Sequence, residues 1–223
     1  TVTGVQTCAL PISTCCAEAP VDLTDVTRAA HNADVPGLEQ AFDCDDPFVR
    51  AIALAGLHKN GALTPRHIAL ATTDPARQVR HRLAEIGAAD ARVDLLRLLD
   101  DAEFAVAETA AWALGERSEI ADEQMQALIL SAASHPDALV RESCVAALGS
   151  IGDARGLPAI LHALHDKPAV RRRAVVSLAP FDGPDVTAAL NEALSDRDWQ
   201  VRQAAEDLLA AENAGGTELP DSD

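Results

Sequence analysis

The sequence has few aromatic residues and no long apolar segment. Of its 223 residues, 3% are aromatic, none is tyrosine and one is methionine, so large rings cannot fill most of a core. No apolar run approaches the roughly 18 residues that a membrane-spanning helix needs, and we expect no membrane span. Because 48% of the residues are nevertheless hydrophobic, the core must consist mainly of Ala, Leu, Val and Ile, which suits closely packed helices.

Basic residues are also scarce. Eighteen Lys and Arg against 35 Asp and Glu give a formal net charge of −17, which repels a phosphate backbone, so no nucleic acid partner is expected. The closest basic groupings are Arg77, Arg80 and Arg82, and residues 171–173. We expect these arginines to pair with nearby carboxylates on helix surfaces. The acidic excess favours a protein or peptide partner with a basic face.

The cysteines form neither a Cys-x-x-Cys motif nor a Cys/His cluster at zinc-finger spacing. They are Cys8, Cys15, Cys16, Cys44 and Cys144. Such a pattern is typical of a reducing compartment, and we expect a cytoplasmic protein. A glycine-rich phosphate loop, a serine elbow and a paired-carboxylate signature are also missing from the sequence.

The two ends of the chain differ from the rest. Residues 2–12 resemble the conceptual translation of a sequencing-library adapter, so about the first thirteen residues are expected to be foreign and residues 1–20 to form an artefactual or disordered leader. A signal peptide is the alternative, but a basic n-region and an apolar core of about seven residues are missing. At the other end, residues 212–223 are expected to be a disordered acidic tail.

A Val-Arg dipeptide recurs along the chain. It occurs as Val49-Arg50, Val79-Arg80, Val140-Arg141, Val170-Arg171 and Val201-Arg202. Val106, followed by Ala107, fills the one gap in the series, and the six valines are 30, 27, 34, 30 and 31 residues apart. This period is close to the length of two short helices with their turns, so the sequence predicts a helical repeat.

Apolar residues four and eight positions after each valine trace one face of a helix. The residues four positions later are Ala53, Leu83, Ala110, Cys144, Ala174 and Ala205. Those eight positions later are Leu57, Gly87, Leu114, Leu148, Leu178 and Leu209. Asp or Pro residues before the valines are typical of helix N-termini. Gly115 and Gly149, each directly after an apolar leucine, are predicted to be left-handed C-caps. Cys144 is therefore predicted to be a small core residue.

A second helix is predicted between consecutive first helices, at about 65–72, 90–99, 121–133, 156–165 and 185–194. Residues 23–32 and 36–42 are predicted to be a degenerate N-terminal unit, and residues 200–211 a lone C-terminal helix. No unit can bury its apolar face alone, so stability must come from stacking.

The stretch from Asp137 to Gly149, Asp-Ala-Leu-Val-Arg-Glu-Ser-Cys-Val-Ala-Ala-Leu-Gly, resembles a short HEAT repeat of the phycobilisome-lyase type, as does Ala-Ala-Trp-Ala-Leu-Gly-Glu at 110–116. The resemblance implies an all-α fold, a right-handed α-α superhelix of about six helix pairs in a single domain, 21–211. In this family an Asp and the Arg after the valine form a ladder between repeats. The ladder is expected to break at Ala107, which replaces the Arg, and at Lys167, which replaces the acid.

The sequence contains little that indicates a catalytic site or a metal site. Some HEAT-type proteins are di-iron hydroxylases with His-Glu dipeptides as metal ligands, but none of the seven histidines here precedes a glutamate. His162 and His165 share a helix face but lack a third ligand, so a solvated surface is favoured. Cys44 precedes a helix start that could lower its thiol pKa, yet a loop residue is the favoured interpretation. We expect no cofactor, no metal and no enzyme activity.

The favoured function is therefore a protein-binding or scaffolding module. Its surface is expected to be built from the second helices, with polar candidates at Arg92, Arg97, Gln126, His162 and Asn191. Trp112 is expected to pack against a neighbouring unit, whereas Trp199, if exposed, is a hot-spot candidate. A chromophore-lyase-like or other modifying subunit and a DNA-binding protein are the alternatives.

Overall fold

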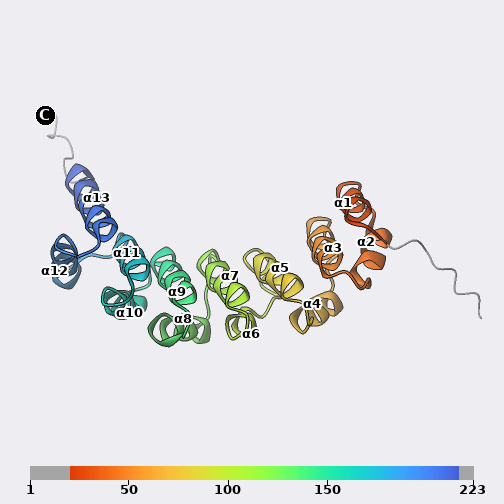
Figure 1. Cartoon of the computed structure of the whole chain (residues 1–223), viewed down its shortest axis with the longest axis horizontal. Coiled ribbons are helices and arrows are strands. Elements are labelled where there is room, and N and C mark those ends of the chain that lie inside the picture. The colour runs from red at the N-terminus through yellow and green to blue at the C-terminus, as the bar shows by residue number, and fades with distance from the viewer. Residues whose placement is uncertain (1–20, 216–223) are drawn as a thin grey trace, which may run out of the picture.

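A computed structural model describes residues 21–215 of the chain. Within this range it contains thirteen α-helices, one short 3-10 helix and no strand (Figure 1), which confirms the all-helical solenoid. The helices form six consecutive pairs followed by a single helix, α13. The predicted leader, 1–20, and residues 216–223 of the predicted tail lie outside the described residues.

Each first helix after the N-terminal one carries one of the six valines, and the second helices lie between the first helices. The first helices are α1 (Leu23–His31), α3 (Pro47–Lys59), α5 (Arg77–Gly87), α7 (Phe104–Gly115), α9 (Ala138–Ile151), α11 (Pro168–Ser177) and α13 (Trp199–Gly215). The second helices are α2 (Val35–Phe42), α4 (Pro65–Thr72), α6 (Leu95–Leu99), α8 (Asp122–Ser134), α10 (Leu157–Ala163, after the 3-10 helix Ala154–Gly156) and α12 (Pro184–Ala193). The predicted alternation of first and second helices is thus confirmed.

Two predicted helix boundaries are wrong. The segment 90–99 is helical only from Leu95, because the Asp94 carboxylate caps the helix there and Asp90 instead accepts the backbone N–H of Arg92 in a turn. The last helix continues to Gly215, four residues beyond the predicted end at 211. Turn chemistry decides the first boundary, and sequence periodicity does not reveal it.

The valines are the buried anchors that the repeat predicts, since each of the six is at most 1% exposed. The residues four positions later are completely buried, Cys144 included. Burial raises the pKa of the Cys144 thiol to about 12, so it stays a neutral core group. Leu209, eight positions after Val201, is only half-buried because no helix after α13 packs on it within the described residues.

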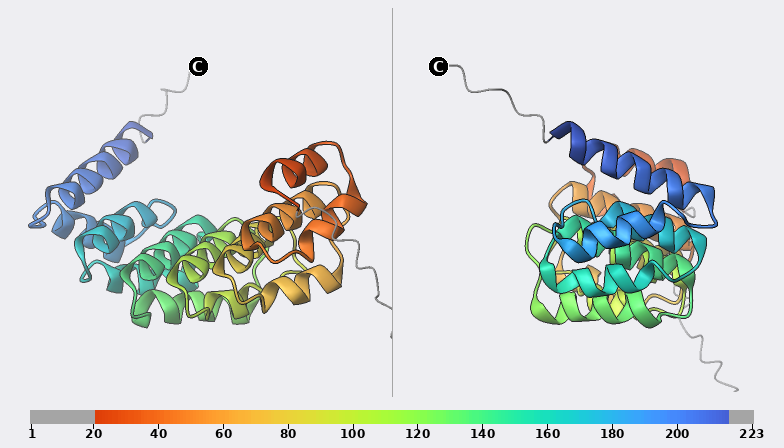
Figure 2. Two further views of the ribbon diagram at one scale, coloured as in Figure 1. Left: turned by 45° about the vertical axis from the view of Figure 1, so that its right-hand side comes forward. Right: turned by 90° about the vertical axis from the view of Figure 1, so that its left-hand side faces the viewer.

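The stack of helices is curved, and the first helices line its inner side. Figures 1 and 2 show α1, α3, α5, α7, α9, α11 and α13 along the concave side and the second helices along the convex side. Consecutive first helices pack extensively against each other, whereas contacts between consecutive second helices are sparser. Tight packing on one side and looser packing on the other bends the stack toward the first helices.

Gly115 and Gly149 are not the left-handed caps that the sequence predicts. Both lie inside helices, and the left-handed residue after α9 is Gly152, with φ of 67°. A Cβ on Gly115 would lie 2.8 Å from the Cα of Ala147 in α9. A Cβ on Gly149 would lie 2.6 Å from the Cβ of Ser177 in α11. These glycines let adjacent first helices approach closely.

We predict that Gly115→Ala destabilises the protein although alanine is the better helix former. Alanine alone would contribute about 1 kcal/mol in favour of the helix. The new methyl group meets the backbone of Ala147, which cannot move aside without shifting α9. Overpacking of this kind should lower the free energy of unfolding by a net of about 1 to 2 kcal/mol, measured by urea denaturation. Ser150→Ala, at an exposed site of α9, is the control, and an equal or higher stability of Gly115→Ala would contradict the close-approach argument.

Candidate binding surface

Arginines after the valines join consecutive repeats along one edge of the solenoid. In each rung the Nε and Nη2 atoms of the arginine bind both carboxylate oxygens of an aspartate in the next repeat. The rungs are Arg50–Asp74, Arg80–Asp101, Arg141–Asp166 and Arg171–Asp196. Nη1 donates to backbone carbonyls in the turn before the arginine's own helix, as from Arg171 to Asp166 at 2.8 Å. Each rung therefore fixes two turns relative to each other.

The rungs shift the pKa values of the four arginines and of aspartate partners such as Asp166 and Asp196. Hydrogen bonding to aspartate raises the pKa of each of the four arginines. Hydrogen bonds from Arg141 and Arg171 lower the pKa values of Asp166 and Asp196, respectively. The carboxylates are thus held in the charged form at neutral pH.

The expected break in the ladder at Ala107 is confirmed, because alanine has no donor for the next turn. The structure adds a second change at the same junction: His135 occupies the position where the partner acid would lie. Its backbone carbonyl accepts a hydrogen bond from Nη1 of Arg141, and its ring lies against the N–H of Asp137. Both members of this rung are therefore replaced together.

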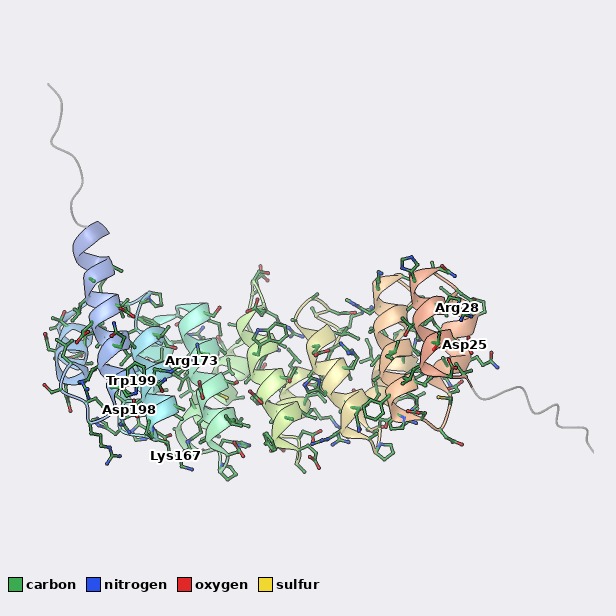
Figure 3. All side chains as sticks on the ribbon, turned by 45° about the horizontal axis from the view of Figure 1, so that its top comes forward. Asp25, Arg28, Lys167, Arg173, Asp198 and Trp199 are labelled. Carbon is green, nitrogen blue, oxygen red and sulfur yellow. The ribbon has the colours of Figure 1, made fainter. Side chains whose placement is uncertain are left out.

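The expected break at Lys167 is wrong. Asp166, one residue earlier, supplies the carboxylate and lies 2.6 Å from Nε of Arg141. The backbone N–H of Lys167 itself donates to that carboxylate. Lys167 is exposed, immediately before the start of α11 (Figure 3). A shift of one residue in the turn is enough for the acid to reach the arginine, and an alignment of single positions misses it.

A second set of polar side chains links repeats along the opposite edge, in the turns from first to second helices. The links are Asn60 to the carbonyl of Ala30, Arg92 to that of Leu63, Arg117 to those of Gly87 and Val93, and Arg155 to the carboxylate of Asp122. The sequence analysis missed this set. Its signal is a polar residue 11 to 15 positions after each of four successive valines.

Five of the six arginines in the two basic groupings pair with carboxylates, as expected, whereas Arg172 has no ion pair among the described residues. Besides the ladder arginines, Arg77 lies 3.9 Å from Glu103, Arg82 pairs with Glu85, and Arg173 lies 3.6 Å from Glu142. Arg82 and Arg173 occupy the same register, three positions after a valine. In both, the Nε atom is buried without a hydrogen-bond partner.

Exposed apolar side chains gather on the first helices. Among the described residues, nine large hydrophobic side chains are exposed, and seven of them belong to first helices. These seven are Leu23, Phe48, Phe104, Trp112, Leu139, Val176 and Trp199. The other two, Leu70 and Leu130, belong to second helices. The first helices, which line the concave side (Figure 1), therefore carry most of the exposed large hydrophobic side chains among the described residues.

The two tryptophans are both exposed. Trp112 is 47% exposed, so the expectation that it packs against a neighbour is wrong. It lies six positions after Val106, in the same register as Val176, which is also exposed. Trp199 is 64% exposed at the start of α13, and Figure 3 shows it beside the helix that carries Arg173. It thus meets the condition for a hot-spot candidate.

Two hollows lie between first helices, one near each end of the concave side. The N-terminal hollow, of about 540 Å³, lies between α1, α3, α5 and α7, with Leu23, Phe48 and Ile52 among its lining residues. The C-terminal hollow, of about 480 Å³, lies between α11 and α13, and its lining includes Val176 and Trp199. Exposed apolar side chains thus line both depressions.

The polar candidates of the second helices lie away from these hollows. All are exposed: Arg92, Arg97, Gln126, His162 and Asn191. Arg92 precedes α6 and is held by Asp90 and the carbonyl of Leu63, and the others belong to helices on the convex side. The second helices do form a continuous row, but the concave surface belongs to the first helices, because these pack more tightly.

The candidate ligands for metal and thiol chemistry stay apart. His162 and His165 are exposed, and the described residues contain no group of three or more His, Cys, Asp or Glu side chains placed to hold a metal ion. Cys44 is half-buried in the turn before α3, where its Sγ donates to the carbonyl of Asp46. Among the helices described in residues 21–215, none has the length and apolar character needed to cross a membrane.

Comparison with protein families decides the assignment of the repeat. The sequence profile of HEAT repeats matches residues 92–179 and 125–210, which together span more than half of the chain. The chain belongs to the HEAT-repeat family. The comparison of this HEAT-repeat protein with curated proteins found no match.

Solved structures with similar folds include natural and designed helical repeats. Human deoxyhypusine hydroxylase in complex with glycerol is 20% identical, with a TM-score of 0.46, and the match covers 85% of this chain and 77% of that one. A computationally designed armadillo repeat protein for modular peptide recognition is 18% identical, with a TM-score of 0.44 and coverage of 84% and 86%. These likenesses concern the fold alone.

We predict that Arg171→Met lowers the free energy of unfolding by about 2 to 4 kcal/mol. The Arg171 side chain is 5% exposed, and its loss leaves the Asp166 carbonyl without this donor and the Asp196 carboxylate with only the backbone N–H of Asp198. Urea denaturation followed by circular dichroism measures the change. Arg28→Met removes an exposed pair, 63% and 52% accessible, with Asp25 on α1 (Figure 3) and should cost less than about 1 kcal/mol. Equal effects of the two substitutions would contradict a structural role for the ladder.

Acid should weaken the ladder. The pKa of Asp196 is lower in the folded chain than in the unfolded chain, where it is about 3.9. Its stabilising effect is therefore complete above about pH 5 and is lost as the pH falls through the folded pKa. We predict that Asp196→Asn is less stable than the original protein at pH 7 and that the difference shrinks at about pH 3, as measured by urea midpoints. A difference independent of pH would contradict this assignment.

Proposed function

We propose that this HEAT-repeat protein is a non-catalytic binding or scaffolding module that holds a protein or peptide partner against the concave side of its first helices. The observation that carries the proposal is the gathering of seven exposed large hydrophobic side chains on these helices. Exposed apolar side chains grouped on one face are typical of interaction surfaces, and tryptophan is a frequent anchor in them. The curved stack offers this surface without any change of shape.

The acidic charge supports contacts at the edges of the solenoid. Exposed carboxylates lie in the turns before first helices, for example at Asp43, Asp45, Asp46 and Asp100. With a net charge of −17, such an edge attracts a partner with a basic face and speeds its association. We propose such a partner for the edges, as the composition suggests.

The alternatives have weaker support. A chromophore-lyase-like or other modifying subunit rests on the phycobilisome-lyase-type resemblance alone. A DNA-binding role is disfavoured because the ladder arginines already bind carboxylates. The lyase-type subclass, the adapter origin of residues 2–12, the single domain at 21–211 and a cytoplasmic location stay proposals of the same kind.

Photo-crosslinking tests the binding role. With benzoylphenylalanine at Leu139, on α9 and 46% exposed, we expect irradiated cells that contain the full chain to yield a discrete crosslinked protein. The same probe at Phe104, on α7 and 42% exposed, should yield the same adduct. The crosslinked species is identified by mass spectrometry.

A probe on the opposite side is the matched control. Leu130 on α8 is 67% exposed, so a probe there is even more accessible than at Leu139 and should give no adduct with that partner. Crosslinks from Leu130 alone, or none from either concave position, would overturn the proposal.

A further inference from the structure

We propose that the N-terminal hollow binds an acidic, apolar peptide segment of a partner protein. An apolar side chain of the segment lies against Phe48 and Ile52, and a neighbouring carboxylate binds the Arg82 guanidinium. This inference rests on the proposed binding role of the concave side and deepens it by naming the site and the chemistry of its ligand.

The apolar part of the hollow is large and open. Its volume of about 540 Å³ falls within the range of ligand pockets in proteins, roughly 300 to 1,000 Å³. Phe48 is 56% exposed and Leu23 is 49% exposed on neighbouring helices, and Ile52 lies one turn after Phe48 on the same face. An apolar side chain that enters between them removes this surface from water.

The ionisable side chains that line the hollow are all basic. Its lining includes Arg77, His81 and Arg82 and no carboxylate. Arg82 and His81 both pair with one acid, Glu85, and Arg77 lies 3.9 Å from Glu103. Because these basic side chains line the hollow while Glu85 and Glu103 lie outside its lining, a carboxylate in the hollow meets hydrogen-bond donors and a basic group meets no carboxylate.

The Arg82 guanidinium has hydrogen-bond donors that its pairing with Glu85 does not use. Its Nη1 atom binds Glu85, while its buried Nε atom has no hydrogen-bond partner. An unsatisfied buried donor is costly, and the side chain is still 40% exposed. A small rotation brings its free edge to a carboxylate in the hollow, which a guanidinium binds with two parallel hydrogen bonds.

The C-terminal hollow lacks this combination. Arg173 has the same register as Arg82 and also an unpartnered Nε, but it faces Glu142 at 3.6 Å and does not line that hollow. The lining there carries both Arg172 and Asp207, so the charges offset each other. Acidic residues lie close to the N-terminal hollow, since Asp46 accepts a hydrogen bond from the backbone N–H of Phe48, so the preference for an acidic ligand rests on the basic side chains that line the hollow.

Three labelled peptides in one Gly-Ser background test the ligand chemistry against the full chain. Their central residues are Leu-Asp-Leu-Glu, the amide counterpart Leu-Asn-Leu-Gln, and the basic counterpart Leu-Lys-Leu-Lys. We expect the acidic peptide to bind at least about tenfold more tightly than the amide peptide, since a charge-assisted pair is lost, and the basic peptide to bind most weakly. Fluorescence anisotropy gives the three Kd values.

Variants locate the site. Arg82→Gln and Phe48→Ser should each weaken binding of the acidic peptide by about tenfold. Arg173→Gln, the register-matched arginine outside the hollow, and Leu130→Ser on the convex side should leave the Kd unchanged. In NMR spectra the indole signal of Trp199, which lines the C-terminal hollow, should not shift.

Several outcomes would overturn the inference. They are an unchanged Kd in Arg82→Gln, equal or tighter binding of the basic peptide, and no binding of the acidic peptide at about 1 mM. Tighter peptide binding by the full chain with Leu10→Ser and Ile12→Ser would show that the chain's own N-terminal residues fill the hollow, which also overturns it. Crosslinks from Leu139 without peptide binding would refute this inference alone, whereas peptide binding without crosslinks would count against the proposed partner.

Discussion

The close contact between consecutive first helices is the constraint on which the rest of the structure depends. No helix pair has an apolar face that it can cover by itself, so the repeats are stable only when they stack on one another. Small residues make this contact possible, as where Gly115 meets the backbone of Ala147. The same contact bends the stack, because the second helices are packed less tightly, and it places the first helices on the concave side.

Polar links at the two edges hold the repeats in register and leave the concave side free. The Arg–Asp rungs lie in the turns before the first helices, and the links of Asn60, Arg92, Arg117 and Arg155 lie in the turns after them. First helices also approach closely at Gly115, between α7 and α9, and at Gly149, between α9 and α11. Apolar packing thus holds the helices together between the two edges, and hydrogen bonds join consecutive repeats along each edge.

The sequence predicted the parts of the fold that depend on local spacing. The valine register, the buried residues four positions later and most helix boundaries follow from a helix of 3.6 residues per turn and from turn residues. The sequence-based prediction was wrong where the role of a residue depends on its contacts with a neighbouring repeat. Gly115 looked like a cap because it follows an apolar run, but its role is set by Ala147, 32 positions later. Asp166 was overlooked because it reaches Arg141 from a shifted position.

By itself, then, the sequence determined that this chain is a helical repeat, where its units begin and which side chains anchor them, because helix periodicity is written in a single segment. Only the tertiary structure decided which helices form the concave side, that Trp112 and Trp199 are exposed, and that Phe48, His81 and Arg82 line one hollow. The reason is physical: curvature and exposure depend on how closely separate repeats pack, and that distance depends on contacts between residues far apart in the chain.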